Sequence, residues 1–147
     1  MEISLIPVTQ ENRQIAESLS VAPGQENFIE SVKECMQEAD EISDWHPMLI
    51  CSDNNIIGFT MYGYMKAEKK PRLWFDRLLI DCKYQNCGYG KKAVKAIIEQ
   101  IKKEYPDKDI YLSAYPENQV AIRLYKSFGF DFTGELDLKG EHIMILK

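Results

Sequence analysis

The stretch Tyr84–Lys92, YQNCGYGKK, places two glycines between an apolar run and a helical pattern. The run LLI at residues 78–80 predicts a buried strand, and the apolar residues between Val94 and Ile101 recur at helical spacing. A glycine-rich turn between a strand and a helix can present backbone N–H groups to a phosphate at the positive end of the helix dipole. It can equally be a plain tight turn, and Cys87 within it could be a reactive thiol.

Two lysines favour the phosphate interpretation. Lys91 and Lys92 fall in the first turn of the predicted helix, where a cation meets the dipole unfavourably by roughly 0.3 to 1 kcal/mol. Bound phosphate would explain that placement. A P-loop is excluded because no G-x-x-x-x-G-K-[ST] is present, and a Rossmann fingerprint is disfavoured because this loop follows a hairpin rather than opening a βαβ unit.

Strand and helix patterns alternate along the whole chain. This order predicts a mixed sheet flanked by helices, of the α/β or α+β class. The expected elements are a strand at Ile3–Val8, a helix capped by Thr9 and ending near Leu19, a helix at Gln25–Asp40, a hairpin at 47–64, a strand at 72–81, the helix stopped by Pro106, a strand at 109–115, a helix at Asn118–Phe128 before Gly129, and a hairpin at 130–146.

Length and composition favour one domain spanning residues 1–147. The 147 residues are 45% hydrophobic, enough to form a core without metals or disulfides as staples. No apolar run approaches the ~20 residues that span a bilayer, and no secretory signal pattern begins the chain, so we expect a cytoplasmic protein that does not bind membranes. The net charge of -5 argues against nucleic acid as a partner and tolerates a cationic one.

Metal binding is not expected. The four cysteines contain no CxxC pair, and only two histidines are available as nitrogen ligands. In a reducing compartment the thiols are better explained as small buried hydrophobes or spectators.

Two motifs identify a family. Gln85, Gly88 and Gly90 match Q/R-x-x-G-x-G/A, and residues 118–130 match N-x-x-A-x-x-L-Y-x-x-x-G-F in full. With these motifs the chain resembles the GNAT superfamily of N-acetyltransferases, which implies a GNAT fold with a mostly antiparallel central sheet and acetyl-CoA as co-substrate. The cofactor-binding residues implied are Leu78, Leu79 and Ile80 for the pantetheine arm, Gln85, Asn86, Cys87, Gly88, Tyr89, Gly90 and Lys91 for the pyrophosphate, and Asn118.

The loop departs from the family pattern at two positions. Asn86 and Cys87 stand where a glycine and a lysine are common, so binding by backbone amides is expected to survive while the usual lysine contribution is lost. Asn118 has two compatible roles, as an N-cap of its helix and as a ligand of the cofactor.

The resemblance implies two catalytic residues, Tyr125 and Asp76. Tyr125 would protonate the departing CoA thiolate, although on its helix it could also be a core residue beside Ala121 and Leu124. Asp76 precedes Leu78 by two, which predicts that both side chains face the same side of the strand. Because deprotonating an alkylamine at pH 7 costs about 4.6 kcal/mol, an acid that receives or orients the amine is useful there; the alternative is a surface Asp paired with Arg77 or Arg72.

A small polyamine is the expected acceptor. Dispersed similarity favours the bacterial spermine/spermidine acetyltransferases, and the glutamates at every fourth position from Glu26 to Glu38 could bind a polycation or could simply be a solvated helix face. Another amine (a protein N-terminus, an amino acid or a drug) and a non-catalytic acyl-CoA sensor remain alternatives, and a homodimer is implied by resemblance alone. The substrate-binding candidates are Phe28, Glu30, Glu34 and Trp74, with Trp45 and Tyr62 as further aromatics that could line an alkylamine channel or belong to the core.

Overall fold

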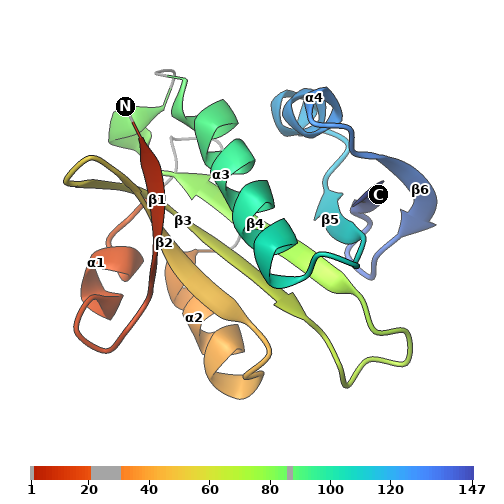
Figure 1. Ribbon diagram of the computed structural model, residues 1–147, viewed down its shortest axis with the longest axis horizontal. Coiled ribbons are helices and arrows are strands. Elements are labelled where there is room, and N and C mark those ends of the chain that lie inside the picture. Colours follow the sequence, from red (N-terminus) through yellow and green to blue (C-terminus); the bar gives the residue numbers. More distant parts are fainter. Residues whose placement is uncertain (1, 21–30, 86–87) are drawn as a thin grey trace.

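A computed structural model describes residues 2–20, 31–85 and 88–147 of the chain. Figure 1 gives the arrangement of the helices and strands. In chain order they are β1 (Ile3–Pro7), α1 (Arg13–Glu17), α2 (Val32–Glu41), β2 (His46–Ser52), β3 (Asn55–Tyr64), β4 (Leu73–Ile80), the 3-10 turn η1 (Cys82–Tyr84), α3 (Tyr89–Glu104), β5 (Ile110–Ala114), α4 (Gln119–Ser127), β6 (Asp131–Leu136) and β7 (His142–Leu146).

The strands form a seven-stranded sheet in the order β1-β2-β3-β4-β5-β7-β6. Every neighbouring pair is antiparallel except β4 and β5, which run parallel. The α3 helix supplies the crossover that a parallel pair requires. The expected class, a mixed and mostly antiparallel sheet flanked by helices, is confirmed.

The sheet carries a hydrophobic core on each face. Along β2, Met48 and Ile50 pack on the side of α3, whereas Leu49 and Cys51 pack on the side of α1 and α2, as the two-residue period of a strand requires. Figure 1 shows α3 running across the sheet, with α4 beside β5 and with α1 and α2 at the other end of the molecule. Both faces of the central strands are therefore covered, which explains their long apolar runs.

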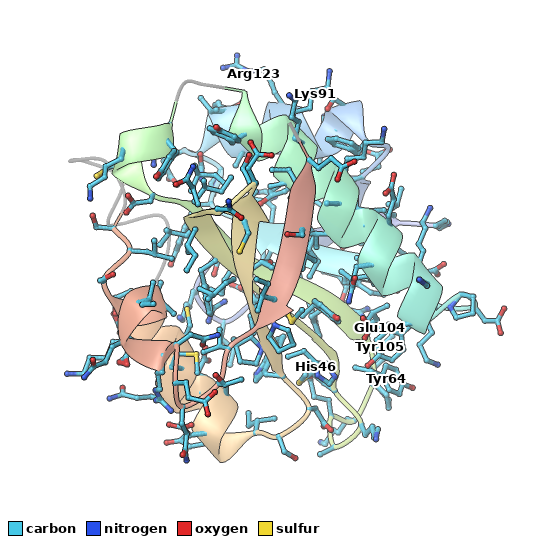
Figure 2. All side chains as sticks on the ribbon, turned by 60° about the vertical axis from the view of Figure 1, so that its left-hand side comes forward. His46, Tyr64, Lys91, Glu104, Tyr105 and Arg123 are labelled. Atoms are coloured by element: carbon cyan, nitrogen blue, oxygen red, sulfur yellow. The ribbon has the colours of Figure 1, made fainter. Side chains whose placement is uncertain are left out.

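The C-terminal end of α3 is attached to the sheet by a buried tyrosine. Tyr62 is 2% exposed, and its hydroxyl donates a hydrogen bond of 2.5 Å to Glu104. In Figure 2, Glu104 and Tyr105 lie beside His46 and Tyr64, while Lys91 marks the opposite end of the helix. Tyr62 is thus a core residue under α3, which is one of its two expected roles. The alternative prediction, that Tyr62 lines an alkylamine channel, is wrong.

A β-bulge interrupts β4 at Arg77. Thr60 of β3 pairs with Leu78 and the next residue, Met61, pairs with Asp76, so Arg77 is the extra residue. Since paired residues share a face and neighbours on a strand alternate, Asp76 and Leu78 face opposite sides of the sheet. Leu78 packs with the α3 core, and Met61 belongs to the core of α1 and α2. The prediction that Asp76 and Leu78 point the same way is wrong, because the bulge shifts the alternation by one.

The first two helices are shorter than predicted. Asn12 accepts a hydrogen bond from the Thr9 backbone N–H and donates to the Pro7 carbonyl, which holds this segment as a turn, and α1 begins only at Arg13. Ser31 is extended (φ -62, ψ 155) and forms a capping box with Glu34, so α2 begins at Val32 rather than near Gln25. The remainder of the predicted start, residues 25–30, lies outside the described part of the chain.

The C-terminal half follows the sequence prediction closely. The α3 helix ends at Glu104, two residues before Pro106, and α4 is followed by Gly129 in a left-handed conformation with φ 103. The β6–β7 hairpin turns through Gly140, with φ 83. No helix within the described ranges is both long and apolar enough to cross a membrane.

Candidate active site

A cavity of about 440 Å³ opens where β4 and β5 part. The two strands pair in parallel at only two positions, Leu73 with Ile110 and Trp74 with Tyr111. The residues that follow on both strands, Phe75–Ile80 and Leu112–Ala114, instead line the cavity. The separation leaves the β4 edge that faces β5 open to a ligand, while its other edge stays paired with β3.

The N-terminus of α3 forms one wall of this cavity. Gly88 is the N-cap and adopts a left-handed conformation with φ 81, so a glycine is favoured there by the backbone itself. Gly90 does not have a positive φ, so its backbone does not favour glycine. A Cβ at this position would also meet nothing closer than Leu124 Cδ2, at 3.8 Å. The motif at residues 85–90 accepts glycine or alanine at position 90, so a small residue there leaves space for a ligand at the backbone amides.

Gln85 closes the end of β4. Its side-chain amide donates a hydrogen bond of 2.9 Å to the Ile80 carbonyl, and both residues line the cavity together with Tyr84 and Tyr89. The structure therefore gives Gln85 a role in holding the loop, in addition to any ligand contact. Lys91 is exposed in the first turn of α3, as expected. Asn86 and Cys87 lie outside the described residues, and so do their predicted contacts.

Tyr125 lies at the other wall, on α4. It is 9% exposed, and its ring makes edge-on contacts with Phe75 and Phe130, each at a centroid distance of 5.9 Å. Burial, followed by the nearby charge of Asp76, raises the pKa of Tyr125. The hydroxyl is consequently protonated throughout the physiological pH range and can act as a proton donor.

Asn118 begins α4 at the same cavity. Its side chain accepts a hydrogen bond from the Ala121 backbone N–H at 3.4 Å, so the expected N-cap is confirmed. Because Asn118 also lines the cavity, contact with a ligand remains compatible with capping.

Carboxylates outnumber cations three to one among the described residues that line the cavity. The acids are Asp76, Glu117 and Glu141, and the cation is Arg77. Asp76 is paired with Arg77, as one of the two sequence interpretations expected, yet it still lines the cavity.

Glu141 is a cavity residue that sequence reasoning missed. It reaches the site because β7 pairs with β5, and it accepts a hydrogen bond from Ser113 at 3.4 Å. An acidic lining suits a cationic ligand.

Comparison with known proteins decides the family. The family model described as "Acetyltransferase (GNAT) family" matches residues 13–130. The spermine/spermidine N(1)-acetyltransferase of Bacillus subtilis (strain 168) is 42% identical over 149 residues, which cover 99% of this chain and 98% of that protein. The chain belongs to the GNAT family of acetyltransferases.

Solved structures show the same fold for this acetyltransferase. Spermidine N-acetyltransferase from Vibrio cholerae, in complex with CoA and spermine, superposes with a TM-score of 0.75 at 15% identity, covering 99% of this chain and 95% of that one. The aminoglycoside acetyltransferase AAC(6')-Ib, in complex with coenzyme A, gives a TM-score of 0.81 at 18% identity, covering 99% and 95%. At these identities the likeness concerns the fold, and both proteins were solved with coenzyme A bound.

The predicted substrate residues of this acetyltransferase are not all brought together. Trp74 packs against Tyr111 at a centroid distance of 5.7 Å and is not among the described residues that line the cavity. Glu34 is engaged in the capping box of α2, a structural reason for its position. Phe28 and Glu30 lie outside the described residues. Across residues 2–20, 31–85 and 88–147, no group of three His, Cys, Asp or Glu side chains is placed to hold a metal ion.

Proposed function

We propose that this GNAT protein transfers the acetyl group of acetyl-CoA to an amino group of a small polyamine, by direct attack in a ternary complex. The observation that carries the proposal is the meeting of three features in one cavity: the N-terminus of α3, the open edge of β4 and Tyr125. The first suits a pyrophosphate, the second suits the amides of a pantetheine arm, and the third suits a leaving thiolate.

Acetyl-CoA fits this lining through backbone groups. The amides at the start of α3 can bind the pyrophosphate because Gly88 and Gly90 leave no side chain in the way. The backbone of Leu78–Ile80 can pair with the pantetheine amides as an additional strand would. Side-chain chemistry contributes little to this half of the site, which is consistent with the absence of the common lysine at position 87.

The chemistry needs one proton donor and one proton acceptor. The neutral amine nitrogen attacks the thioester carbonyl carbon, the new C–N bond forms, and the C–S bond breaks when the tetrahedral intermediate collapses. Tyr125 gives its hydroxyl proton to the departing thiolate and regains one from solvent. The Asp76 carboxylate, or a water molecule that it orients, takes the proton that the amine loses.

The acidic part of the lining supports a polycationic acceptor. Acetyl-CoA is itself an anion, so carboxylates at this cavity disfavour it and are better explained by a cationic second substrate. All three acids line the cavity. In this proposal Asp76 receives the reacting nitrogen, and Glu141 or Glu117 binds a second ammonium of the same molecule. The full-length likeness to a spermine/spermidine acetyltransferase points to the same class of amine.

Substrate choice is tested by thiol release from acetyl-CoA with spermidine, spermine, putrescine, kanamycin and a set of peptides. We expect the highest kcat/KM with spermidine or spermine, and we expect Glu141→Gln to raise KM for these polyamines more than for a monoamine. Turnover of peptides without polyamines would contradict the proposed acceptor. Tight acetyl-CoA binding with no turnover of any amine would indicate a sensor instead.

A further inference from the structure

Arg77 has an unusual backbone conformation for its residue type. Its φ is 63, in the left-handed region, at the bulge between β3 and β4. Asp53, with φ 54, is the other non-glycine residue with positive φ in the described ranges, and it lies in the β2–β3 turn. For a residue with a Cβ this conformation is strained, whereas glycine adopts it without strain. Interactions of the arginine side chain must therefore offset the strain.

The guanidinium of Arg77 joins β4, which lines the cavity, to α2. Its side chain is 11% exposed; Nη2 lies 2.7 Å from Glu38 Oε2 on α2, and Nη1 lies 2.5 Å from Asp76 Oδ1 on β4. The Arg77 backbone N–H also donates to Asp76 Oδ1, at 3.1 Å. Both ends of the arginine thus hold the same carboxylate, and the side chain ties it to α2.

We propose that Arg77 is a positioning residue of the acetyl-transfer site: clamped between Glu38 and Asp76, it fixes the bulge and holds the Asp76 carboxylate at the cavity wall. This inference rests on the proposed function. The bulge determines which way every later residue of β4 faces, so the clamp also sets the register of the edge at Leu78–Ile80. A guanidinium suits the task because its rigid fork can bind two carboxylates at once.

The clamp has an electrostatic consequence for Asp76. The charged and titratable groups around it are Arg77 on β4, Glu38 on α2, Tyr125 on α4, and the cavity acids Glu117 and Glu141. A cation in contact favours the carboxylate form, and the neighbouring acids oppose it. Removal of Arg77 therefore moves protonation of Asp76 to higher pH, whereas removal of the Glu38 charge moves it to lower pH or leaves it in place.

The test compares Arg77→Gly, Arg77→Lys and Glu38→Gln with the wild type, and uses Glu41→Gln, an exposed acid on the same helix, as the matched control. Glycine accepts the left-handed conformation without strain, so Arg77→Gly isolates the loss of the guanidinium. We expect kcat/KM for spermidine to fall roughly tenfold to a hundredfold in Arg77→Gly and less in Arg77→Lys. The acidic limb of the pH profile of kcat/KM should move to higher pH in Arg77→Gly, but not in Glu38→Gln or Glu41→Gln.

Thermal melts of each variant separate positioning from folding. Wild-type kcat/KM and an unmoved acidic limb in Arg77→Gly would overturn the inference. So would an activity loss that matches the unfolded fraction while the limb stays in place. Failure of the wild type to acetylate polyamines contradicts the proposed acceptor instead, and the same variants are then compared on whichever amine is turned over.

Discussion

Replacement of Gly90 by alanine should make the protein more stable, whereas replacement by valine should make it a poorer acetyl-CoA binder. The new Cβ meets Leu124 Cδ2 at 3.8 Å, an ordinary van der Waals contact, so nothing inside the fold resists it. Alanine is favoured over glycine in a helix interior by about 1 kcal/mol, and at the second position of α3 we take about half of that. For a domain of this size the melting temperature should rise by about 1 to 2 °C.

Ligand binding should distinguish the two substitutions, because the motif at residues 85–90 accepts glycine or alanine at position 90 but no larger residue. The two γ-methyl groups of valine would occupy the space through which a pyrophosphate would reach the first amides of α3. Losing one hydrogen bond to a charged group costs about 1.5 to 3 kcal/mol, which corresponds to acetyl-CoA binding weakened roughly tenfold to a hundredfold.

Calorimetric titration with acetyl-CoA and thermal melts without ligand measure the two effects separately. Lys95→Ala is the matched control, because it changes an exposed side chain on the same helix that is not among the described residues lining the cavity; we expect less than about threefold weaker binding from it, as for a screened surface charge. Gly88→Ala should lower the melting temperature, since φ is 81 at that position. Wild-type acetyl-CoA affinity in Gly90→Val would refute the amide cradle.

Two further substitutions test single side chains. Tyr125→Phe should lower kcat about a hundredfold and leave acetyl-CoA affinity within about threefold of the wild type. Burial, and then the charge of Asp76, raises the pKa of Tyr125, so ionisation of Tyr125 should not lower wild-type kcat below about pH 10. Unchanged kcat in the variant would contradict the acid role. Tyr62→Phe should lower stability by about 1 to 2 kcal/mol. Burial and Glu104 raise the pKa of Tyr62, so its stabilisation is complete below pH ~10 and lost above it; melts from pH 7 to 11 should show the variant less sensitive to alkali, and equal alkaline losses would argue against this assignment.

The elements that sequence reasoning predicted well are set by local signals. The α3 helix needs only its apolar period, its glycines and Pro106, and α4 needs only Asn118 and Gly129. The start of α2 was also encoded locally, in Ser31 and Glu34, but the helical spacing of apolar and acidic residues from Gln25 suggested an earlier start. Capping chemistry rather than charge spacing defines that end of the helix.

Other features depend on how distant segments pair. Nothing in the sequence LWFDRLLI specifies a β-bulge. The bulge appears only in the pairing of β4 with β3, in which Arg77 is the residue without a partner in the register. Glu141 lies in a turn far from the motifs, and the pairing of β7 with β5 brings it to the cavity.

The sequence by itself determined the family and the position of the turn that we propose as the cofactor site. It could do so because a strand, a glycine turn and a helix start are contiguous, and their chemistry resides in the backbone of a few neighbouring residues. The tertiary structure decided which face each residue of β4 presents, where the cavity opens beside β5, and which cation accompanies Asp76. These depend on strand register and on contacts between segments tens of residues apart, which no local pattern specifies.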